Sequence, residues 1–436
     1  MSGLMKTFVL IIVLICLGLI PSCKKEDIHP FNLTTISAGG VDLTATSPNN
    51  VAVTAVITAT FTANIDPSSV TVSSINMTRN YDGANIILTL IAAKNILSIR
   101  STTNLISGAS YTLSVTSALH SSNGVAFQSF TSTFKTIGTF VPSNQVAYWS
   151  FEGIPDDVVG SHDPITTDDA LITYVKSKNI ESGMAASFDG KTSIEQILSG
   201  STLLTPEFTI TFWMWLNSDN HLTANGNQKG SYVFGIGNVH GLQFDVDPNY
   251  AWCRFSHGLF LSDGTTTTTD FQFYANGRTK DNLASEKADS IKLGIDNATT
   301  VCQNLGTSGL KSKLDKVWAQ VAFTFEDSTK TRSMYINGEL MYQQDLGLLD
   351  TTYVLPAIRP LYKAARLQFL PDITARYDDM LVFGFWQSKL NTYNGISTEY
   401  SNPDSNHFQG LLDDVRIFNR ALTALEISLV YKDEKP

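Results

Sequence analysis

The acidic residues near the end of the chain have the spacing of a buried polar site. In the segment GLLDDVRIFNRAL, a strand would place Leu411, Asp413, Val415 and Ile417 on one face. A carboxylate among apolar side chains is costly to bury without a partner. The pattern therefore predicts that Asp413 binds either a cation or an arginine side chain.

A second group of residues has the composition of a sugar-binding site. Aromatic rings stack on the C–H faces of sugars while polar side chains bond the hydroxyls. Packing in the core is the alternative for the same aromatic residues, and it is the one we expect for Trp213 and Trp215. The candidate ligand-binding residues are Tyr250, Trp252, Trp386, Asn391 and Tyr393.

Two further acids raise the possibility of glycoside hydrolysis. Asp245 and Asp247 share a face in the segment QFDVDP, and retaining hydrolases use two carboxylates about 5 Å apart. Pro248 follows at once and no third acid continues the pattern. We therefore expect no catalytic residues and keep hydrolysis as the alternative.

Cysteine usage suggests one disulfide. Cys253 and Cys302 lie well inside the chain, and a bridge between them would stabilise the fold by roughly 4 kcal/mol in an oxidising compartment. The alternative is two thiols, since spacing alone does not show that the Cβ atoms approach. No second Cys or His stands nearby at zinc-ligand spacing.

The N-terminus predicts export and a lipid anchor. Thirteen residues without a charge, 8–20, have the length of a signal peptide core and are too short to span a bilayer comfortably. The segment 20–23 resembles a lipobox, which implies cleavage after residue 22 and acylation of Cys23. An ordinary secretory signal is the alternative. The polar tether 23–30 contains Lys-Glu-Asp, which resembles the signal that sends lipoproteins of Bacteroides-type bacteria to the exterior of the outer membrane.

Composition indicates which structural elements position these residues. The chain has 436 residues, 24 Phe, 15 Tyr and a formal net charge of -10. Low charge and many β-formers predict an all-β protein, and the negative charge argues against nucleic acid as a partner. The length exceeds that of one ordinary domain.

Residues 31–138 are predicted to form the first domain. Short alternating segments recur every eight to twelve residues, divided by turns such as Asp66-Pro67 and Asn123-Gly124, which is typical of a β-sandwich. The segment resembles bacterial Ig-like domains of the S-layer type. The resemblance implies a spacer, and the carboxylates in it are too scattered to suggest chemistry.

Residues 145–433 are predicted to form the second domain. Five segments resemble, in order, the laminin G-like, concanavalin A-like jelly-roll family: AYWSFEG, ASFDGKTSIE, EFTITFWMWLNS, the hairpin carrying YINGELM, and GLLDDVRIFNRAL. The family pattern is interrupted near 217–310 and 376–408, which we interpret as insertions that hold extra hairpins or a binding surface.

The resemblance also implies a structural calcium site. Many domains of this family bind Ca²⁺, and the opening and closing strands are neighbours in the fold. Carboxylates from both strands, together with loop carbonyls, would form the oxygen cage that Ca²⁺ prefers. The residues are Glu152, Asp163, Asp413 and Asp414, and a salt bridge to Arg416 or Arg420 is the alternative.

These inferences lead to one functional expectation. The chain is expected to be a lipid-anchored protein of the outer membrane, facing the exterior, that recognises a glycan or a surface protein without catalysis. Polysaccharide capture and adhesion are the roles that the resemblance implies, and a glycoside hydrolase of the concanavalin A-like class is the alternative.

Overall fold

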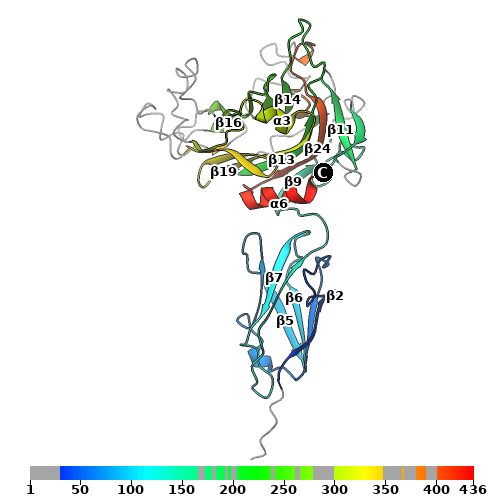
Figure 1. Cartoon of the computed structure of the whole chain (residues 1–436), viewed down its shortest axis with the longest axis vertical. Coiled ribbons are helices and arrows are strands. Elements are labelled where there is room, and N and C mark those ends of the chain that lie inside the picture. The colour runs from blue at the N-terminus through cyan, green and yellow to red at the C-terminus, as the bar shows by residue number, and fades with distance from the viewer. Residues whose placement is uncertain are drawn as a thin grey trace, which may run out of the picture. The chain divides into compact units, whose positions relative to one another are not determined.

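The computed structural model describes most of the chain from residue 30 onward (Figure 1). The chain divides into two compact units, Met1–Leu105 with Ala109–Ile137, and Ile106–Gly108 with Gly138–Pro436. In the described part, no helix is both long and apolar enough to cross a membrane. The described residues are 30–164, 172–178, 183–191, 195–197, 203, 205–236, 241–260, 266–277, 299–346, 366–367, 380–388 and 400–436.

Short strands build the first unit as two sheets. One has the strand order β2-β1-β3-β6-β5 and the other β4-β7-β8. Their apolar side chains meet in an aromatic core, where the Phe61 ring stacks 5.0 Å from Phe31 and meets Phe127 edge-on at 5.3 Å. The predicted Ig-like sandwich is confirmed. Its elements are β1 (Leu33–Ala38), β2 (Val41–Asp42), β3 (Ile57–Phe61), η1 (Pro67–Ser69), β4 (Ile75–Arg79), β5 (Leu88–Ala93), β6 (Ile96–Ser101), β7 (Ser110–Val115) and β8 (Phe130–Lys135).

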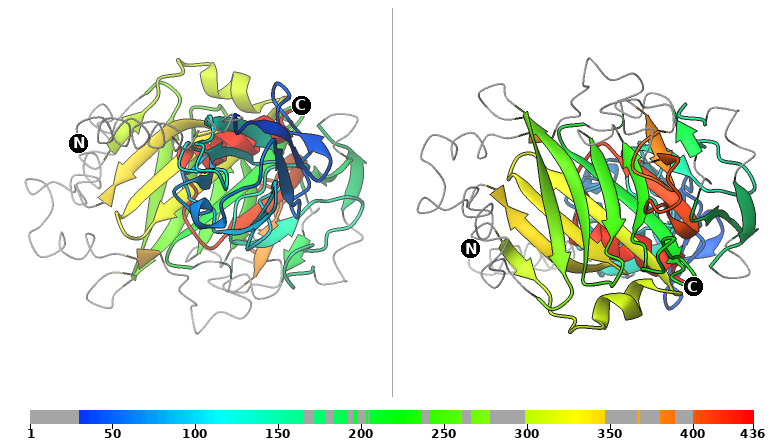
Figure 2. Two further views of the ribbon diagram at one scale, coloured as in Figure 1. Left: turned by 90° about the horizontal axis from the view of Figure 1, so that it is seen from below. Right: turned by 90° about the horizontal axis from the view of Figure 1, so that it is seen from above.

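The second unit is a sandwich of two larger sheets (Figure 2). The nine-stranded sheet has the order β10-β11-β24-β13-β19-β20-β21-β18, with β9 also paired to β24. The predicted opening and closing strands are therefore neighbours. The strands are β9 (Gln145–Trp149), β10 (Thr173–Lys176), β11 (Met184–Asp189), β13 (Phe208–Leu216), β18 (Thr299–Cys302), β19 (Trp318–Glu326), β20 (Thr331–Ile336), β21 (Glu339–Asp345) and β24 (Gln409–Phe418).

The seven-stranded sheet has the order β12-β23-β14-β15-β16-β17, with β22 paired to β16. Four of these strands lie within the segment 217–310, so this segment builds most of this layer, while its β18 belongs to the other sheet. The strands are β12 (Glu195–Ile197), β14 (Ser231–Ile236), β15 (Leu242–Val246), β16 (Trp252–Phe260), β17 (Thr266–Tyr274), β22 (Arg366–Leu367) and β23 (Leu381–Phe383).

Phenylalanines from both sheets fill the space between them. Phe212 of β13 packs edge-on against Phe234 of β14 at 5.4 Å, and Phe323 of β19 stacks on Phe255 of β16 at 4.8 Å. Burying each such side chain contributes roughly 1.5–3 kcal/mol. This shared core fixes which side chains of each sheet face outward.

The described residues of the second unit also form two helices, α3 (Gly309–Leu314) and α6 (Ala424–Glu434). A capping box begins α6: the Thr423 hydroxyl accepts a bond from Glu426 N, and a Glu426 carboxylate oxygen accepts one from Thr423 N. α6 covers the outer face of the nine-stranded sheet through a cluster that includes Phe418 and Ile427.

Candidate functional site

The closing strand β24 carries a one-residue bulge at its two aspartates. On the neighbouring strand β13, Thr211 lies opposite Arg416 and Trp213 lies opposite Asp413. Between these two pairs β24 therefore contains one more residue than β13. Asp414 has a φ of 47°, in the left-handed region that aspartate tolerates better than most residues. The bulge therefore changes which side chains of β24 face the core.

One consequence is that the predicted face of Asp413 is wrong. Before the bulge Leu412, and not Leu411, belongs to the core, whereas after it Val415 and Ile417 do. Asp413 lies on the outer side of the sheet and is buried there. It still needs a partner, because its carboxylate is buried.

A lysine supplies that partner. The Lys178 ammonium nitrogen lies 2.6 Å from Asp413 Oδ2 and 2.7 Å from Asp414 Oδ2, and the ion pair with Asp413 is buried on both sides. The same nitrogen lies over two indole rings, 5.3 Å from the ring centroid of Trp213 and 5.7 Å from that of Trp318. Lys178 thus occupies a cage of two carboxylates and two aromatic faces.

Charges around this cage shift the pKa of its acids. Burial and the neighbouring Asp414 raise the pKa of Asp413 to about 7, against the opposing effect of Lys178. The pKa of Asp414 is lowered instead, because Lys178 and Arg416 outweigh the cost of its burial. The two carboxylates therefore differ in how readily they take up a proton.

Arg416 extends the charged cluster to the C-terminal helix. Its Nη1 lies 2.6 Å from Glu434 Oε1, and the other oxygen of Glu434 accepts a bond of 2.8 Å from Trp213 Nε1. The guanidinium lies 4.3 Å from the ring centroid of Tyr148, whose hydroxyl donates to Asp414. These contacts attach α6 and β9 to the bulge of β24.

The four carboxylates predicted to bind calcium are not gathered around one point. Glu152 accepts a bond from Met184 N at 3.0 Å, and Asp163 accepts one from Asp157 N at 3.0 Å. The other two carboxylates hold Lys178. Within the described ranges, no group of three or more His, Cys, Asp or Glu residues is placed to hold a metal ion. These residues do not fit the calcium site that the resemblance implied.

The predicted disulfide is also wrong. Cys253 and Cys302 are both thiols. Cys253 points into the core from β16, where its sulfur is 3.7 Å from Met334 Sδ, while Cys302 belongs to β18 of the other sheet. Burial raises the pKa of the Cys253 thiol well above its ordinary value.

The outer face of the seven-stranded sheet carries a regular grid of polar and aromatic side chains, which we call the platform. Because Phe244, Phe255 and Phe271 point into the core, the alternating residues of β15, β16 and β17 point outward. Opposed residues form three rows across the strands: Trp252 and Tyr274; Tyr232, Asp245, Arg254 and Gln272; Gln243, Ser256 and Asp270.

Much of the platform is accessible. Trp252, Arg254, Gln272 and Tyr274 are half-buried and Asp270 is exposed. The right-hand view of Figure 2 looks onto this sheet, with β14 to β17 in green at the front. Half-buried aromatic rings beside amides and carboxylates have the composition of a site for a polar ligand with apolar faces.

Arg254 organises the platform. Its Nε lies 2.9 Å from Asp245 Oδ1 and its Nη1 lies 3.0 Å from Asp270 Oδ2. The Ser256 hydroxyl also donates to Asp270, at 2.6 Å, and the guanidinium lies 4.9 Å from the centroid of the Trp252 ring. Two acids and one indole hold the guanidinium, so it is a fixed part of the surface.

The two acids on which the hydrolase alternative depended, Asp245 and Asp247, have different structural partners. Burial raises the pKa of Asp245 to about 6, although Arg254 opposes the shift. Asp247 caps the turn between β15 and β16, where its Oδ2 accepts bonds from Asn249 N at 2.9 Å and Ala251 N at 3.1 Å. Each carboxylate is thus engaged with its own structural partners.

One end of the platform is bounded by a wall of aromatic residues. The Trp386 carbonyl lies where a Cβ on Gly235 of β14 would stand. Only a glycine in β14 therefore lets the segment 380–388 pass over the strand at this point. Phe385 stacks on the buried ring of His407 with centroids 4.1 Å apart, and Tyr400 meets that ring edge-on. The wall leaves β15 to β17 as the open part of the platform.

The structure places the predicted ligand-binding residues in different surroundings. Trp252 lies on the platform, whereas Trp386 is buried in the wall. Tyr250 is buried in the core, and its hydroxyl donates to Asp315 Oδ1 at 2.8 Å. Asn391 and Tyr393, like the lipidation residue Cys23, lie outside the described residues.

Sequence reasoning missed most of the platform although a signal was present. Trp252, Arg254 and Ser256 alternate with apolar or buried residues in WCRFSHG, and Asp270 and Gln272 do so in TDFQFY. Alternation of this kind predicts a strand with one polar face. The missing information was which faces of which strands lie side by side.

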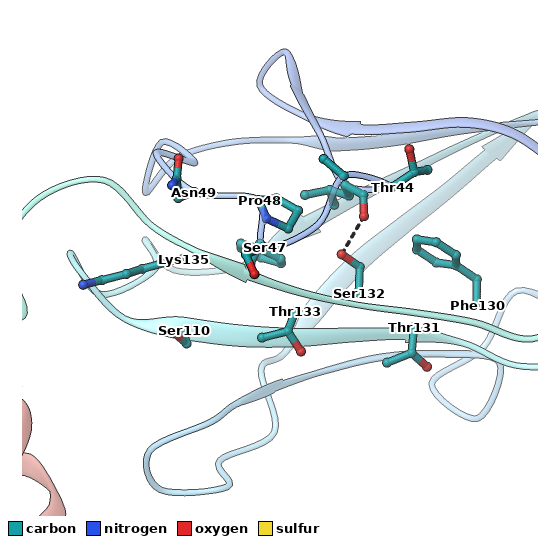
Figure 3. Close-up of a pocket in the computed structure, with 13 residues that line it drawn as sticks. Thr44, Ser47, Pro48, Asn49, Ser110, Phe130, Thr131, Ser132, Thr133 and Lys135 are labelled. Carbon is teal, nitrogen blue, oxygen red and sulfur yellow. Dashed lines mark hydrogen bonds between the residues drawn. The ribbon is translucent and has the colours of Figure 1, made fainter.

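The Ig-like unit contains a separate hollow beside β8. It has a volume of about 540 Å³ and lies between β8 and the segment 43–49 (Figure 3). Hydroxyl side chains such as Thr44, Thr131 and Thr133 line it, and the Ser132 hydroxyl donates to the Leu43 carbonyl at 2.7 Å. That bond ties the segment to the strand, so this hollow belongs to the local packing of the unit.

These observations define an all-β protein in which an Ig-like sandwich precedes a jelly-roll sandwich with one open, polar and aromatic sheet face. Residues 40–136 match the family model described as bacterial Ig-like domain, so the first unit contains a domain of that family. No curated protein matches the chain.

Several solved structures are similar to part of the chain. The receptor-binding domain of botulinum neurotoxin type G is 14% identical, with a TM-score of 0.36, over 66% of this chain and 51% of that one. The binding domain of Paraclostridial mosquitocidal protein 1 is 13% identical, with a TM-score of 0.38, over 66% of this chain and 52% of that one. The chain thus aligns with about half of each. The site must therefore be interpreted from its own geometry.

Proposed function

We propose that this chain is a surface-displayed glycan-binding protein whose ligand docks on the platform. The observation that carries the proposal is the three-row grid of aromatic, amide and carboxylate side chains on the outer face of β14 to β17. A sugar ring needs both an aromatic surface and fixed polar partners, and the grid offers both within one sheet face.

Rigidity supports this role. The side chains of the platform stand on paired strands over a packed phenylalanine core, and Arg254 is held by two carboxylates. Groups held in place before binding lose little conformational freedom when the ligand arrives. Asp245 and Asp247 each bond a structural partner, an arrangement that suits recognition without catalysis.

Display at the surface belongs to the same proposal. Acylation of Cys23 would anchor the chain to the outer membrane, and the Ig-like unit would act as a spacer. Several acyl chains give stable attachment, because each buried methylene contributes about 0.8 kcal/mol. Radiolabelled palmitate should label the wild type but not a Cys23→Ala variant, and protease added to intact cells should degrade the wild type. Absence of label would remove the anchor from the proposal.

A glycan-array screen of the full-length protein in detergent tests the binding function. Trp252→Ala should abolish binding to any glycan that the wild type captures, since the indole supplies an aromatic face of the platform. Trp215→Ala is the matched control, because Trp215 is also half-buried but stands on β13 of the other sheet. Equal loss in both variants would contradict the platform as the site.

The same screen separates the alternatives. A reducing-sugar assay on each bound glycan should detect no release of new ends, and release would replace the proposal by glycoside hydrolysis. A blank array with a correctly folded protein would replace it by adhesion to a protein partner.

A further inference from the structure

We infer that the platform selects neutral glycans and rejects acidic ones, such as those bearing sialic acid, uronic acid or sulfate. This inference rests on the proposed glycan-binding function and adds the chemical class of the ligand. It follows from the balance of charges on the outer face of the seven-stranded sheet.

Among the described residues of the grid, Arg254 is the cation and Asp245 and Asp270 are the anions. The three formal charges sum to one negative charge. Asp247, at the β15–β16 turn, is a third carboxylate and adds one more negative charge. An anionic ligand would therefore approach a surface that is itself negatively charged. The whole chain is negative too, with a net charge of -10.

The arginine is poorly placed to reverse this balance. Its Nε and Nη1 already bond the two aspartates, and its Cζ lies over the Trp252 ring, 4.9 Å from the ring centroid. The N–H donors that remain belong to a cation whose charge the two aspartates more than offset. A ligand carboxylate bonded to these donors would lie near both aspartates, so repulsion by the acids would oppose the contact.

Asp270 is the acid that meets the ligand first. Its side chain is 50% exposed, whereas that of Asp245 is 7% exposed. The carboxylate also accepts a bond from the Ser256 hydroxyl, so its position over the open part of the platform is fixed. Asparagine at this position would keep the shape and remove the charge.

The test compares matched neutral and acidic oligosaccharides that differ in one carboxylate or sulfate, with the full-length protein in detergent at low salt. We expect the acidic member to bind at least about tenfold more weakly, a difference of about 1.4 kcal/mol. Raising the salt concentration should narrow the difference by screening the repulsion. Asp270→Asn should narrow it at low salt.

Asp327→Asn is the matched control. It changes the net charge of the protein equally, but Asp327 lies in the turn between β19 and β20, where it pairs with Lys330. The gap between neutral and acidic ligands should be unchanged in this variant. If Asp327→Asn narrows the gap as much as Asp270→Asn, overall charge and not the platform sets the preference, and the inference fails.

Two other outcomes separate the inference from the function on which it rests. Acidic glycans that bind as tightly as neutral ones, in a manner that Trp252→Ala abolishes, would overturn the inference and leave the glycan-binding function in place. Failure of the folded wild type to bind any member of either class would overturn both.

Discussion

The ammonium group of Lys178 lies 2.6 Å from Asp413 Oδ2, at the carboxylate for which a bound cation was expected. Lys178 comes from the loop after β10 and Asp413 from the strand that closes the fold, 235 residues later. A lysine of the chain thus provides the positive charge. The pair joins distant segments, and breaking it should affect the whole second unit.

Lys178→Met should destabilise the protein strongly. The variant leaves Asp413 and Asp414 buried without their shared cation, and removing one partner of a buried pair costs about 3–5 kcal/mol. Urea unfolding at pH 8 would measure the loss. Lys313→Met, which removes a lysine paired with the exposed Glu339, is the control and should have little effect.

Thermal unfolding of the wild type tests the calcium hypothesis. With Lys178 in the cage, added Ca²⁺ or a chelator should not change the melting temperature of the wild type. A melting temperature that rises with calcium in the wild type, but not in an Asp413→Asn variant, would show that this carboxylate binds the ion and would contradict the arrangement described above.

Two buried histidines, His221 and His407, should make the second unit sensitive to acid. Burial, together with nearby Lys229, lowers the pKa of each to about 4. Asp189 opposes the shift at His407. An unfolded histidine takes up a proton below about pH 6.5, so the stability that these residues contribute is present above pH 6.5 and lost as the pH falls toward 4.

His407→Phe should reduce this loss. Phenylalanine keeps the stacking on Phe385 and the edge contact with Tyr400 but does not titrate. Between pH 7 and pH 5 the variant should lose roughly 2 kcal/mol less stability than the wild type, because one fewer proton binds the unfolded state. Urea titrations at several pH values measure this difference. Parallel pH dependences in the two proteins would rule out the histidine as the cause.

The cysteines should behave as thiols throughout. Counting thiols in the denatured protein with and without prior reduction should give the same number, since Cys253 and Cys302 are not bridged. In the native protein Cys253 should resist alkylation, because the buried thiol has a raised pKa. If reduction increased the count by two thiols, the protein would contain a disulfide and this prediction would be wrong.

Local features of the fold could be predicted from sequence, and features that depend on distant contacts could not. The capping box of Thr423 and Glu426 involves residues only three apart, so the sequence pattern itself indicates it. Packing in the core was expected for Trp213 and Trp215, but Trp213 faces outward, beneath Tyr431 of α6. Nothing in the strand itself shows that a helix whose Glu434 lies 221 residues later covers that face.

The same reasoning explains the errors at the candidate site. Alternation assigns Asp413 to the wrong face because a bulge adds one residue to β24, and a bulge leaves no trace in an apolar pattern. The sequence could not show that Lys178 pairs with Asp413, because the two residues are far apart in the chain and meet only in the folded structure. The platform required the register of four strands, although each strand displayed its own polar face.

Finally, the ligand preference of the platform should depend on pH through Asp245. Burial raises the pKa of this carboxyl to about 6, so Asp245 is charged at pH 8 and increasingly neutral below pH 6. Its protonation removes one negative charge beside Arg254. The penalty against acidic glycans should therefore be smaller at pH 5 than at pH 8. Asp245→Asn should make that penalty independent of pH over this range, with thermal melts to verify folding. If the penalty still changes with pH in Asp245→Asn, another group titrates on the platform and Asp245 does not control the preference.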